Sequence, residues 1–253
     1  MLIDKPMNLM RPAARLPRYG TRMRLGMILA APNHVAEADV AAMLPDGVAL
    51  HTTRLALRGT SAAQLQEMTG NAEAAASLLA DARVDLIVFH CTAASTVDPD
   101  MGTRIAQRIQ AATGIPATAT SEALVAAASA LQLRRIVMLT PYVQSVNDAE
   151  VAFFAHYGVQ VIQEAGFLPP QGQGSASASP QEWLERALSM RRDDADGYLL
   201  GCTNIRALPI IGALEQALRK PVITSNQTMV WHCLRKGGIV DSVEGYGSLL
   251  ALH

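Results

Sequence analysis

Short apolar runs alternate along the chain with longer, alanine-rich stretches in which apolar residues recur at helical spacing. The runs have the length of β-strands, and this alternation is typical of βαβ units that build a mainly parallel sheet. The predicted strands cover 24–31, 48–55, 84–90, 116–119, 135–140, 159–164, 196–201 and 221–224. The predicted helices lie near 35–44, 61–82, 98–113, 121–131, 145–157, 180–193, 205–218 and 226–236.

The same series of landmarks occurs twice in the chain. Three pairs of similar segments make up this series. Arg24 and Arg134 mark the first pair and are 110 residues apart, and Cys91 and Cys202 mark the second and are 111 apart. Pro116 and Pro221 mark the third pair and are 105 apart. Nearly equal offsets indicate an internal repeat. We therefore predict an α/β fold with two pseudo-symmetric, Rossmann-like halves, each a four-stranded parallel sheet flanked by helices. The first half is expected to comprise 22–128 and 229–253, and the second 129–228.

Composition narrows the class of protein. Of the 253 residues, 50% are hydrophobic and 17% are charged, and the net charge is −1. Without a basic excess we expect no nucleic-acid partner. No apolar run approaches the roughly 18 residues that cross a bilayer, so no membrane association is expected. Residues 1–21 lack the apolar core of a secretory signal and are predicted to form a flexible extension, which favours a cytoplasmic location.

The chain contains three cysteines, too few for a disulfide scaffold, and we expect reduced thiols. No Cys-x-x-Cys or His-x-x-x-His spacing indicates a metal site. The Gly-x-Gly at 172–174 lacks the third glycine and the preceding buried strand of a dinucleotide fingerprint. Neither a metal nor a cofactor is therefore predicted. Cys233 lies in a predicted helix and is expected to be a small buried filler.

Cys91 and Cys202 have matching surroundings. Each follows an Asp and a short apolar run, and each is followed by a threonine, Thr92 or Thr203. A buried strand that ends in a thiol places it at the carboxyl edge of the sheet, where open α/β folds bind ligands. Two such thiols could approach one carbon from opposite faces. The pair therefore predicts thiol acid–base or thiol addition chemistry, although a single cysteine in this position would also fit a buried filler.

The backbone after these strands should help the thiols to react. Free thiols are slow nucleophiles until the protein stabilises the thiolate. A strand end that leads into a helix offers backbone N–H groups and the positive end of a helix dipole, and Thr92 and Thr203 add hydroxyl donors. The same donors would hold a carboxylate or an enolate. We expect Ala93 and Asn204, beside the two threonines, to belong to the substrate site.

Asn33 and Tyr142 end the first strand of each half and are expected to face the same cleft. An amide and a phenol there could bind a carboxylate, while the alternatives are a helix cap for Asn33 and packing for Tyr142. His90 precedes Cys91 directly and should point to the opposite face, so we expect it to be structural. The Gly/Ser-rich segment 169–180 is either a surface loop or a mobile lid over the site.

These residues resemble a known family. Segments 25–33 and 140–147 and both Cys-Thr pairs are similar to the aspartate/glutamate racemase superfamily, in its branch of maleate cis–trans isomerases and arylmalonate decarboxylases. The resemblance runs from about Arg24 to Tyr246. It implies an enzyme free of cofactor and metal, with two α/β halves and the active site in the cleft between them. Members are commonly homodimers or homotetramers, and we expect the same here.

The resemblance also implies roles for individual residues. Cys91 corresponds to the nucleophile that adds to the double bond of maleate, and Cys202 to the proton donor. Asn33 and Tyr142 correspond to carboxylate-binding residues, with Thr92, Thr203 and Asn204 as further carboxylate donors. The decarboxylases keep only the second-half cysteine, so the presence of Cys91 favours an isomerase of a small carboxylate or dicarboxylate.

Three other functions remain open at this point. The context Gly-Cys-Thr-Asn at 201–204 is close to that of amino-acid racemases, so an amino-acid or hydantoin-type racemase with two cysteine bases is one alternative. An arylmalonate decarboxylase-like enzyme is another. The third is a non-catalytic protein that binds carboxylates. Rapid alkylation of the thiols would distinguish an enzyme from a binding protein, because only the enzyme needs reactive thiolates.

Overall fold

The computed structural model describes residues 19–59, 61–170 and 173–253. Its strands form two parallel four-stranded sheets. The first sheet has the order β2-β1-β3-β4 and the second the order β6-β5-β7-β8, so the two halves share one topology. The strands are β1 Met23–Ala30, β2 Val48–Leu55, β3 Leu86–His90, β4 Ala117–Ala119, β5 Arg135–Thr140, β6 Gln160–Gly166, β7 Gly197–Leu200 and β8 Val222–Thr224. The predicted α/β fold with two similar sheets is confirmed.

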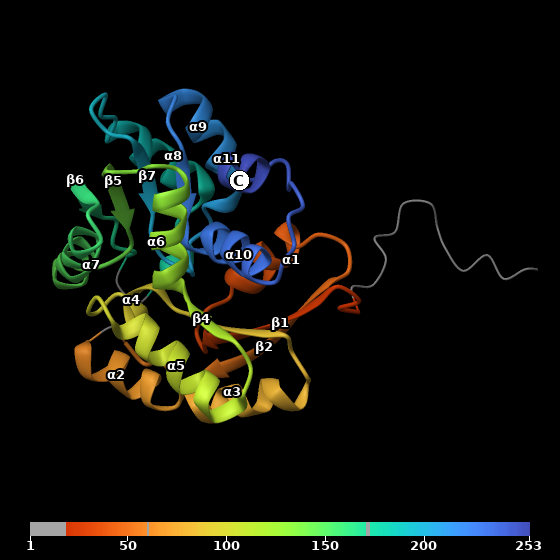
Figure 1. The fold of residues 1–253 in the computed structure, drawn as a ribbon. Helices are drawn as coiled ribbons and strands as arrows, with labels where there is room; N and C mark the ends of the chain where they lie inside the picture. The colour runs from red at the N-terminus through yellow and green to blue at the C-terminus, as the bar shows by residue number, and fades with distance from the viewer. Residues whose placement is uncertain (1–18, 60, 171–172) are drawn as a thin grey trace, which may run out of the picture.

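Helices follow most of the strands, as the alternating pattern predicts. They are α1 Ala36–Met43, α2 Ala62–Gly70, α3 Ala72–Asp81, α4 Thr92–Ser95, α5 Met101–Thr113, α6 Thr120–Ala130, α7 Gln144–His156, α8 Pro180–Ser189, α9 Ile211–Leu218, α10 Ser225–Lys236 and α11 Ser248–Leu252. In Figure 1, α2, α3 and α5 lie on the outer side of the first sheet, and α6 stands between the two sheets and packs against α10. In the described part of the chain, no helix is long and apolar enough to cross a bilayer.

Three helical segments differ from the sequence prediction. The single helix expected over 61–82 is two helices, α2 and α3, which meet at Asn71. Gly70 and Asn71 are poor helix formers, and the backbone at Asn71 (φ −103°, ψ 9°) leaves the helical region there. The short helices α4 and α11 were not predicted, because four or five residues are too few to show a helical period.

Alternating side chains of β1 divide the core of the first half. Leu25, Met27 and Leu29 face the inner side and join a hydrophobic cluster that continues into the second half. Ile28 and Ala30 face the outer side and pack under α2, α3 and α5. Successive strand residues point to opposite faces of a sheet, so one strand supplies both layers.

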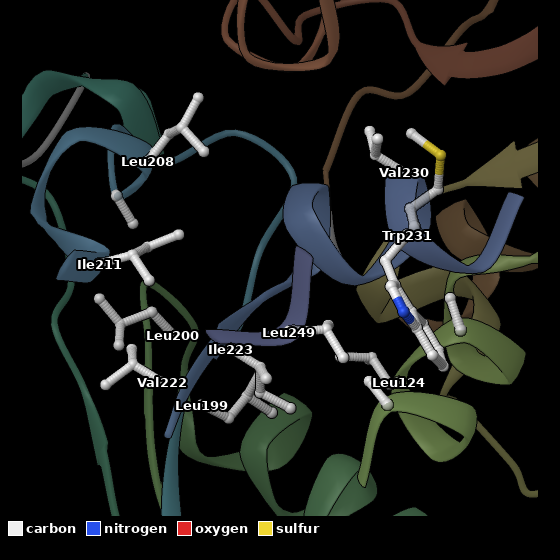
Figure 2. Packing of buried hydrophobic residues seen from close by; sticks show 14 of the residues in the cluster. Leu124, Leu199, Leu200, Leu208, Ile211, Val222, Ile223, Val230, Trp231 and Leu249 are labelled. Carbon is white, nitrogen blue, oxygen red and sulfur yellow. The ribbon is translucent and has the colours of Figure 1, made fainter. Parts of the chain in front are cut away.

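The inner cluster holds the two halves together. Figure 2 shows Leu199, Leu200, Val222 and Ile223 from the second sheet in the same cluster as Trp231 of α10 and Leu124 of α6. Helices from both halves therefore share one apolar interior. This shared packing fixes the position of the carboxyl ends of one sheet relative to those of the other. The borders of the halves at 128/129 and 228/229 stay a prediction, and residues 1–18 of the expected N-terminal extension lie outside the described residues.

Candidate active site

A cavity of about 500 Å³ lies where the carboxyl ends of the two sheets meet. Segments that follow β1, β2 and β3 form one side of it, and segments that follow β5, β6 and β7 form the other. The residues predicted for the site that line it are Asn33, Cys91, Ala93, Tyr142, Cys202, Thr203 and Asn204. The fold thus brings together residues that are up to 171 positions apart in the chain, counting from Asn33 to Asn204.

Cys91 is buried between the end of β3 and the start of α4. Burial raises the pKa of its thiol to about 12, because the thiolate loses hydration there. The backbone N–H of Ala94 opposes this rise, while negative charge on Cys202 or Glu150 adds to it. The Cys91 thiol is therefore protonated near neutral pH.

Cys202 is equally buried, but more donors surround it. The backbone N–H of Asn204 donates to its Sγ at 3.3 Å. Burial raises the pKa of the Cys202 thiol, and hydrogen bonds from the hydroxyls of Tyr142 and Ser175 and from that backbone N–H oppose the rise. The backbone at Cys202 has a φ of 153°, which residues with a Cβ rarely adopt. A thiolate at Cys202 would thus have three donors, whereas one at Cys91 has the single backbone donor.

Asn33 and Thr203 meet at the wall of the cavity. The Asn33 Nδ2 donates to the Thr203 Oγ1 at 3.0 Å, and the backbone N–H of His34 donates to the Asn204 Oδ1 at 3.1 Å. The Asn33 Oδ1 also accepts hydrogen bonds from the N–H groups of Val35 and Ala36, at 3.0 and 2.9 Å. Asn33 therefore caps the N–H groups at the start of α1 and lines the cavity, while its binding of a carboxylate stays a prediction.

Tyr142 lines the cavity at the junction of the two hydrophobic clusters. Its backbone N–H donates to the Thr140 Oγ1 at 3.1 Å, and that hydroxyl donates to the Asn147 Oδ1 at 2.5 Å. The Tyr142 carbonyl packs against Gly166, where an added Cβ would come within 2.2 Å of its oxygen. Burial raises the pKa of the Tyr142 phenol well above 10, so the hydroxyl keeps its proton and acts as a donor.

The chain matches known proteins over nearly its whole length. The family model for arylmalonate decarboxylase matches residues 25–250. The chain belongs to the arylmalonate decarboxylase family. A curated maleate isomerase from Pseudomonas putida is 24% identical over 242 residues, which cover 90% of this chain and 97% of that protein. The predicted membership of the branch that contains maleate isomerases and arylmalonate decarboxylases is thereby confirmed.

Solved structures have the same fold. A cysteine-to-alanine variant of the maleate isomerase from Pseudomonas putida S16, determined with maleate, superposes with a TM-score of 0.86 and 25% identity, covering 90% of this chain and 97% of that one. A cysteine-to-serine variant of the maleate cis–trans isomerase from Nocardia farcinica contains a covalently bound succinylcysteine intermediate. It superposes with a TM-score of 0.85 and 20% identity, covering 91% of this chain and 99% of that one.

In this member of the arylmalonate decarboxylase family, Thr92 is placed differently from the expectation. Its side chain is buried and is not part of the cavity wall. Instead, the Thr92 Oγ1 donates to the Ser225 Oγ at 2.9 Å, and Ser225 accepts a hydrogen bond from the backbone N–H of Cys202 at 3.1 Å. The Thr92 hydroxyl thus connects the two Cys-Thr segments behind the cavity.

His90 points away from the cavity, as expected for the neighbour of Cys91 on a strand. Its Nδ1 lies 2.9 Å from the Thr120 Oγ1 and its Nε2 lies 2.9 Å from the Asn226 Oδ1. Asn226 in turn donates to the Asp39 Oδ2 at 2.8 Å. Burial lowers the pKa of His90 to about 4, so the ring is neutral. Cys233 is fully buried in α10, as expected for a filler.

The segment 173–175 forms part of the cavity wall. The Asn204 Nδ2 donates to the Ser175 Oγ at 3.1 Å, and the Arg206 Nε donates to the Ala178 carbonyl at 3.2 Å. The described part of the predicted loop is therefore bound to the segment after β7. Sequence reasoning did not identify Ser175 as a site residue, since nothing in a Gly/Ser-rich run distinguishes one serine.

Two further residues near the site escaped the sequence analysis. Arg58 lines the cavity at an exposed position, where it offers a positive charge to an anionic ligand. Glu150 is buried in α7, and its charge influences both thiols. A signal for Glu150 was present, because it occupies the apolar stripe of an amphipathic helix. Among the described residues, no group of three or more His, Cys, Asp or Glu side chains is arranged to hold a metal ion.

Proposed function

We propose that the chain is a cofactor-independent isomerase of a small carboxylate, with a maleate-type dicarboxylate as substrate. The observation that carries the proposal is that Cys91 and Cys202, from equivalent strand ends of two similar sheets, line one cavity together with Asn33 and Tyr142. The maleate isomerases among the relatives support this assignment, and so does the succinylcysteine of the Nocardia farcinica protein.

The proposed reaction has two reversible steps. The Cys91 thiolate adds to one carbon of the double bond, and the neighbouring carbon takes the proton of the Cys202 thiol. The carbon–carbon bond is then single and rotates. The Cys202 thiolate next removes a proton from the same carbon, the carbon–sulfur bond breaks, and the trans product leaves while Cys91 is a thiolate again.

The donors around the two thiols fit these different roles. Cys202 becomes an anion when it gives up its proton, and Tyr142, Ser175 and the backbone N–H of Asn204 stabilise that anion. Cys91 carries the substrate and needs fewer donors once the carbon–sulfur bond has formed. Burial keeps both thiols protonated near neutral pH, so the ionisation of Cys91 contributes to the barrier.

The remaining polar groups of the cavity would hold the carboxylates. Asn33, Thr203 and Asn204 line one region of the wall, where the Asn33 amide and the Thr203 hydroxyl are already joined. Arg58 would attract the dianion at the opening. Pro32, Leu57 and Leu65 add apolar wall that excludes water and so strengthens these hydrogen bonds.

Proton NMR of the purified protein with maleate in deuterated buffer tests the proposal. Fumarate should form with the unaltered protein, and Cys91→Ala and Cys202→Ala should each lower the rate by orders of magnitude. Cys233→Ala is the matched control, because that thiol is buried in α10 and does not line the cavity, and it should retain activity. Absence of fumarate, or full activity in either site variant, would overturn the two-thiol isomerase.

A racemase that uses the two cysteines as opposing bases is the second candidate. Both thiols line one cavity, which a two-base reaction also requires. Racemisation exchanges the α-hydrogen of the substrate with solvent, so deuterium would enter amino acids or hydantoins in deuterated buffer. This exchange, without conversion of maleate, would replace the first proposal with the second.

We further propose that the protein works in the cytoplasm as a homodimer or homotetramer. Reduced thiols support the location, because the proposed chemistry needs both cysteines unoxidised and all three cysteines are free. Light scattering of the purified protein tests the oligomeric state, and a monomer at micromolar concentration would contradict it.

A further inference from the structure

Glu150 is the least expected residue near the site. It lies on the buried stripe of α7 with Val146, Asn147, Phe153 and Phe154, and its side chain has no exposed surface. Neither of its carboxyl oxygens has a hydrogen-bond partner among the described residues. The nearby Thr96 hydroxyl donates to the Thr92 carbonyl at 2.9 Å instead. A fully buried carboxyl group without a partner is costly and calls for an explanation.

The carboxyl group of Glu150 lies directly behind the reactive end of β7. A Cβ added to Gly201 would come within 3.3 Å of the Glu150 Oε2 and also within 3.3 Å of the Thr140 Cγ2. Gly201 immediately precedes Cys202, so the carboxyl group packs against the backbone that carries this thiol. Because Gly201 has no side chain, the Glu150 carboxyl group can lie close to the backbone at this position.

Three titratable groups of the site respond to the charge of Glu150. They are Cys91 after β3, Cys202 after β7 and Tyr142 after β5, and a negative Glu150 raises the pKa of each. No arginine, lysine or histidine of the described residues contributes to the pKa of Glu150 itself. Asp148 on α7 and Glu164 on β6 are engaged with Gln144.

Burial raises the pKa of Glu150 to about 8, while the nearby Thr96 hydroxyl opposes the shift. Near neutral pH the group is therefore mainly the uncharged acid. In that form it adds no negative charge to a cavity that must hold a thiolate and an anionic substrate. The carboxylate would oppose both, because like charges in a poorly hydrated site repel strongly.

We propose that Glu150 acts on the reaction through the two thiols: its protonation state controls how readily Cys91 and Cys202 form thiolates. The uncharged acid permits thiolate formation, and the carboxylate suppresses it. This inference rests on the proposed function only in assigning the reaction to the two thiols. It does not depend on maleate being the substrate.

The pH dependence of alkylation by iodoacetamide tests the proposal without any substrate. Peptide mass spectrometry follows Cys91 and Cys202 separately between pH 6 and pH 10. In the unaltered protein, ionisation of Glu150 should restrain the rise in alkylation rate above about pH 8. In Glu150→Gln the rate should continue to rise and should be roughly tenfold higher at pH 9, the effect of one pKa unit.

Asp148→Asn provides the matched control, because this exposed carboxyl group lies on the same helix and is hydrogen bonded to Gln144. Its profile should coincide with that of the unaltered protein. If Glu150→Gln does not fold, Glu150→Met, which places no unpaired polar atom in the core, should show the same change. Superposition of the folded variant and unaltered profiles would show that Glu150 only fills space, and would overturn the proposal. If the unaltered protein does not convert maleate but Glu150→Gln still changes the alkylation profile as expected, only the proposed function would be overturned.

Discussion

The side-chain amide of Asn33 donates a hydrogen bond to the hydroxyl of Thr203 over 3.0 Å, although 170 positions separate the two residues in the chain. One follows β1 and the other follows β7, so the bond joins the two sheets at the wall of the cavity. Both groups are also candidate carboxylate donors. The residues that would hold the substrate therefore also hold the two halves of the site in register.

Loss of the Asn33 amide should affect stability and activity together. Asn33→Ala removes the cap of α1 and the bond to Thr203, and we expect it to lower the free energy of unfolding by about 2 kcal/mol. Thr203→Val removes only the bond and should cost about 1 kcal/mol. Urea unfolding measures both values. Equal losses in the two variants would contradict the capping role of Asn33.

Gly166→Ala should displace Tyr142. The new Cβ would lie 2.2 Å from the Tyr142 carbonyl oxygen, so the turn after β5 must move. We expect a loss of about 2 kcal/mol in the free energy of unfolding and lower turnover, because Tyr142 no longer reaches Cys202. Gly212→Ala, at an exposed position of α9 with no atom within 4 Å, is the control and should be neutral or slightly stabilising. A fully active Gly166→Ala enzyme would show that the position of Tyr142 does not matter.

Thr92→Val separates substrate binding from positioning. The Thr92 hydroxyl donates to Ser225, which in turn accepts from the Cys202 backbone, and it does not line the cavity. We therefore expect kcat to fall by about tenfold with little change in KM, and Thr92→Ser to restore activity. Steady-state kinetics with the substrate identified by NMR measure this. A large rise in KM at unchanged kcat would instead assign Thr92 to carboxylate binding.

His90 should make the fold sensitive to acid. Burial lowers its folded-state pKa to about 4 from the usual 6.5, so the stability that depends on neutral His90 is present above pH 6.5 and is lost as the pH falls towards 4. Asp39, whose pKa burial raises to about 6, acts in the opposite sense, because its ionisation costs stability as the pH rises through that range. The two effects partly cancel in the unaltered protein.

A comparison with His90→Gln isolates the histidine. The difference in free energy of unfolding between the two proteins should shrink by about 2 kcal/mol between pH 7 and pH 4.5, because only the unaltered protein loses stability through His90. Asp39 is present in both proteins, so its contribution largely drops out. Denaturant unfolding at the two pH values measures the difference. A constant difference would mean that His90 is protonated in the folded state without cost.

Local patterns were sufficient to predict the strands. All eight predicted strands agree with β1 to β8 to within two residues at both ends, because each strand is a short apolar run that differs clearly from its flanks. The break between α2 and α3 was missed, since the helical period continues across Gly70 and Asn71 while the backbone does not. The short helix α4 after Cys91 has too few residues for a period.

The sequence by itself determined the duplicated α/β order and the positions of Cys91 and Cys202 at strand ends, because both depend on neighbours within one element. The tertiary structure decided which side chains from the two halves meet. It directs Thr92 to Ser225 behind the cavity, brings Ser175 to Asn204, and places the carboxyl group of Glu150 behind Cys202. These pairings depend on how segments that are distant in the chain pack together, and such packing leaves no periodic signal in the sequence.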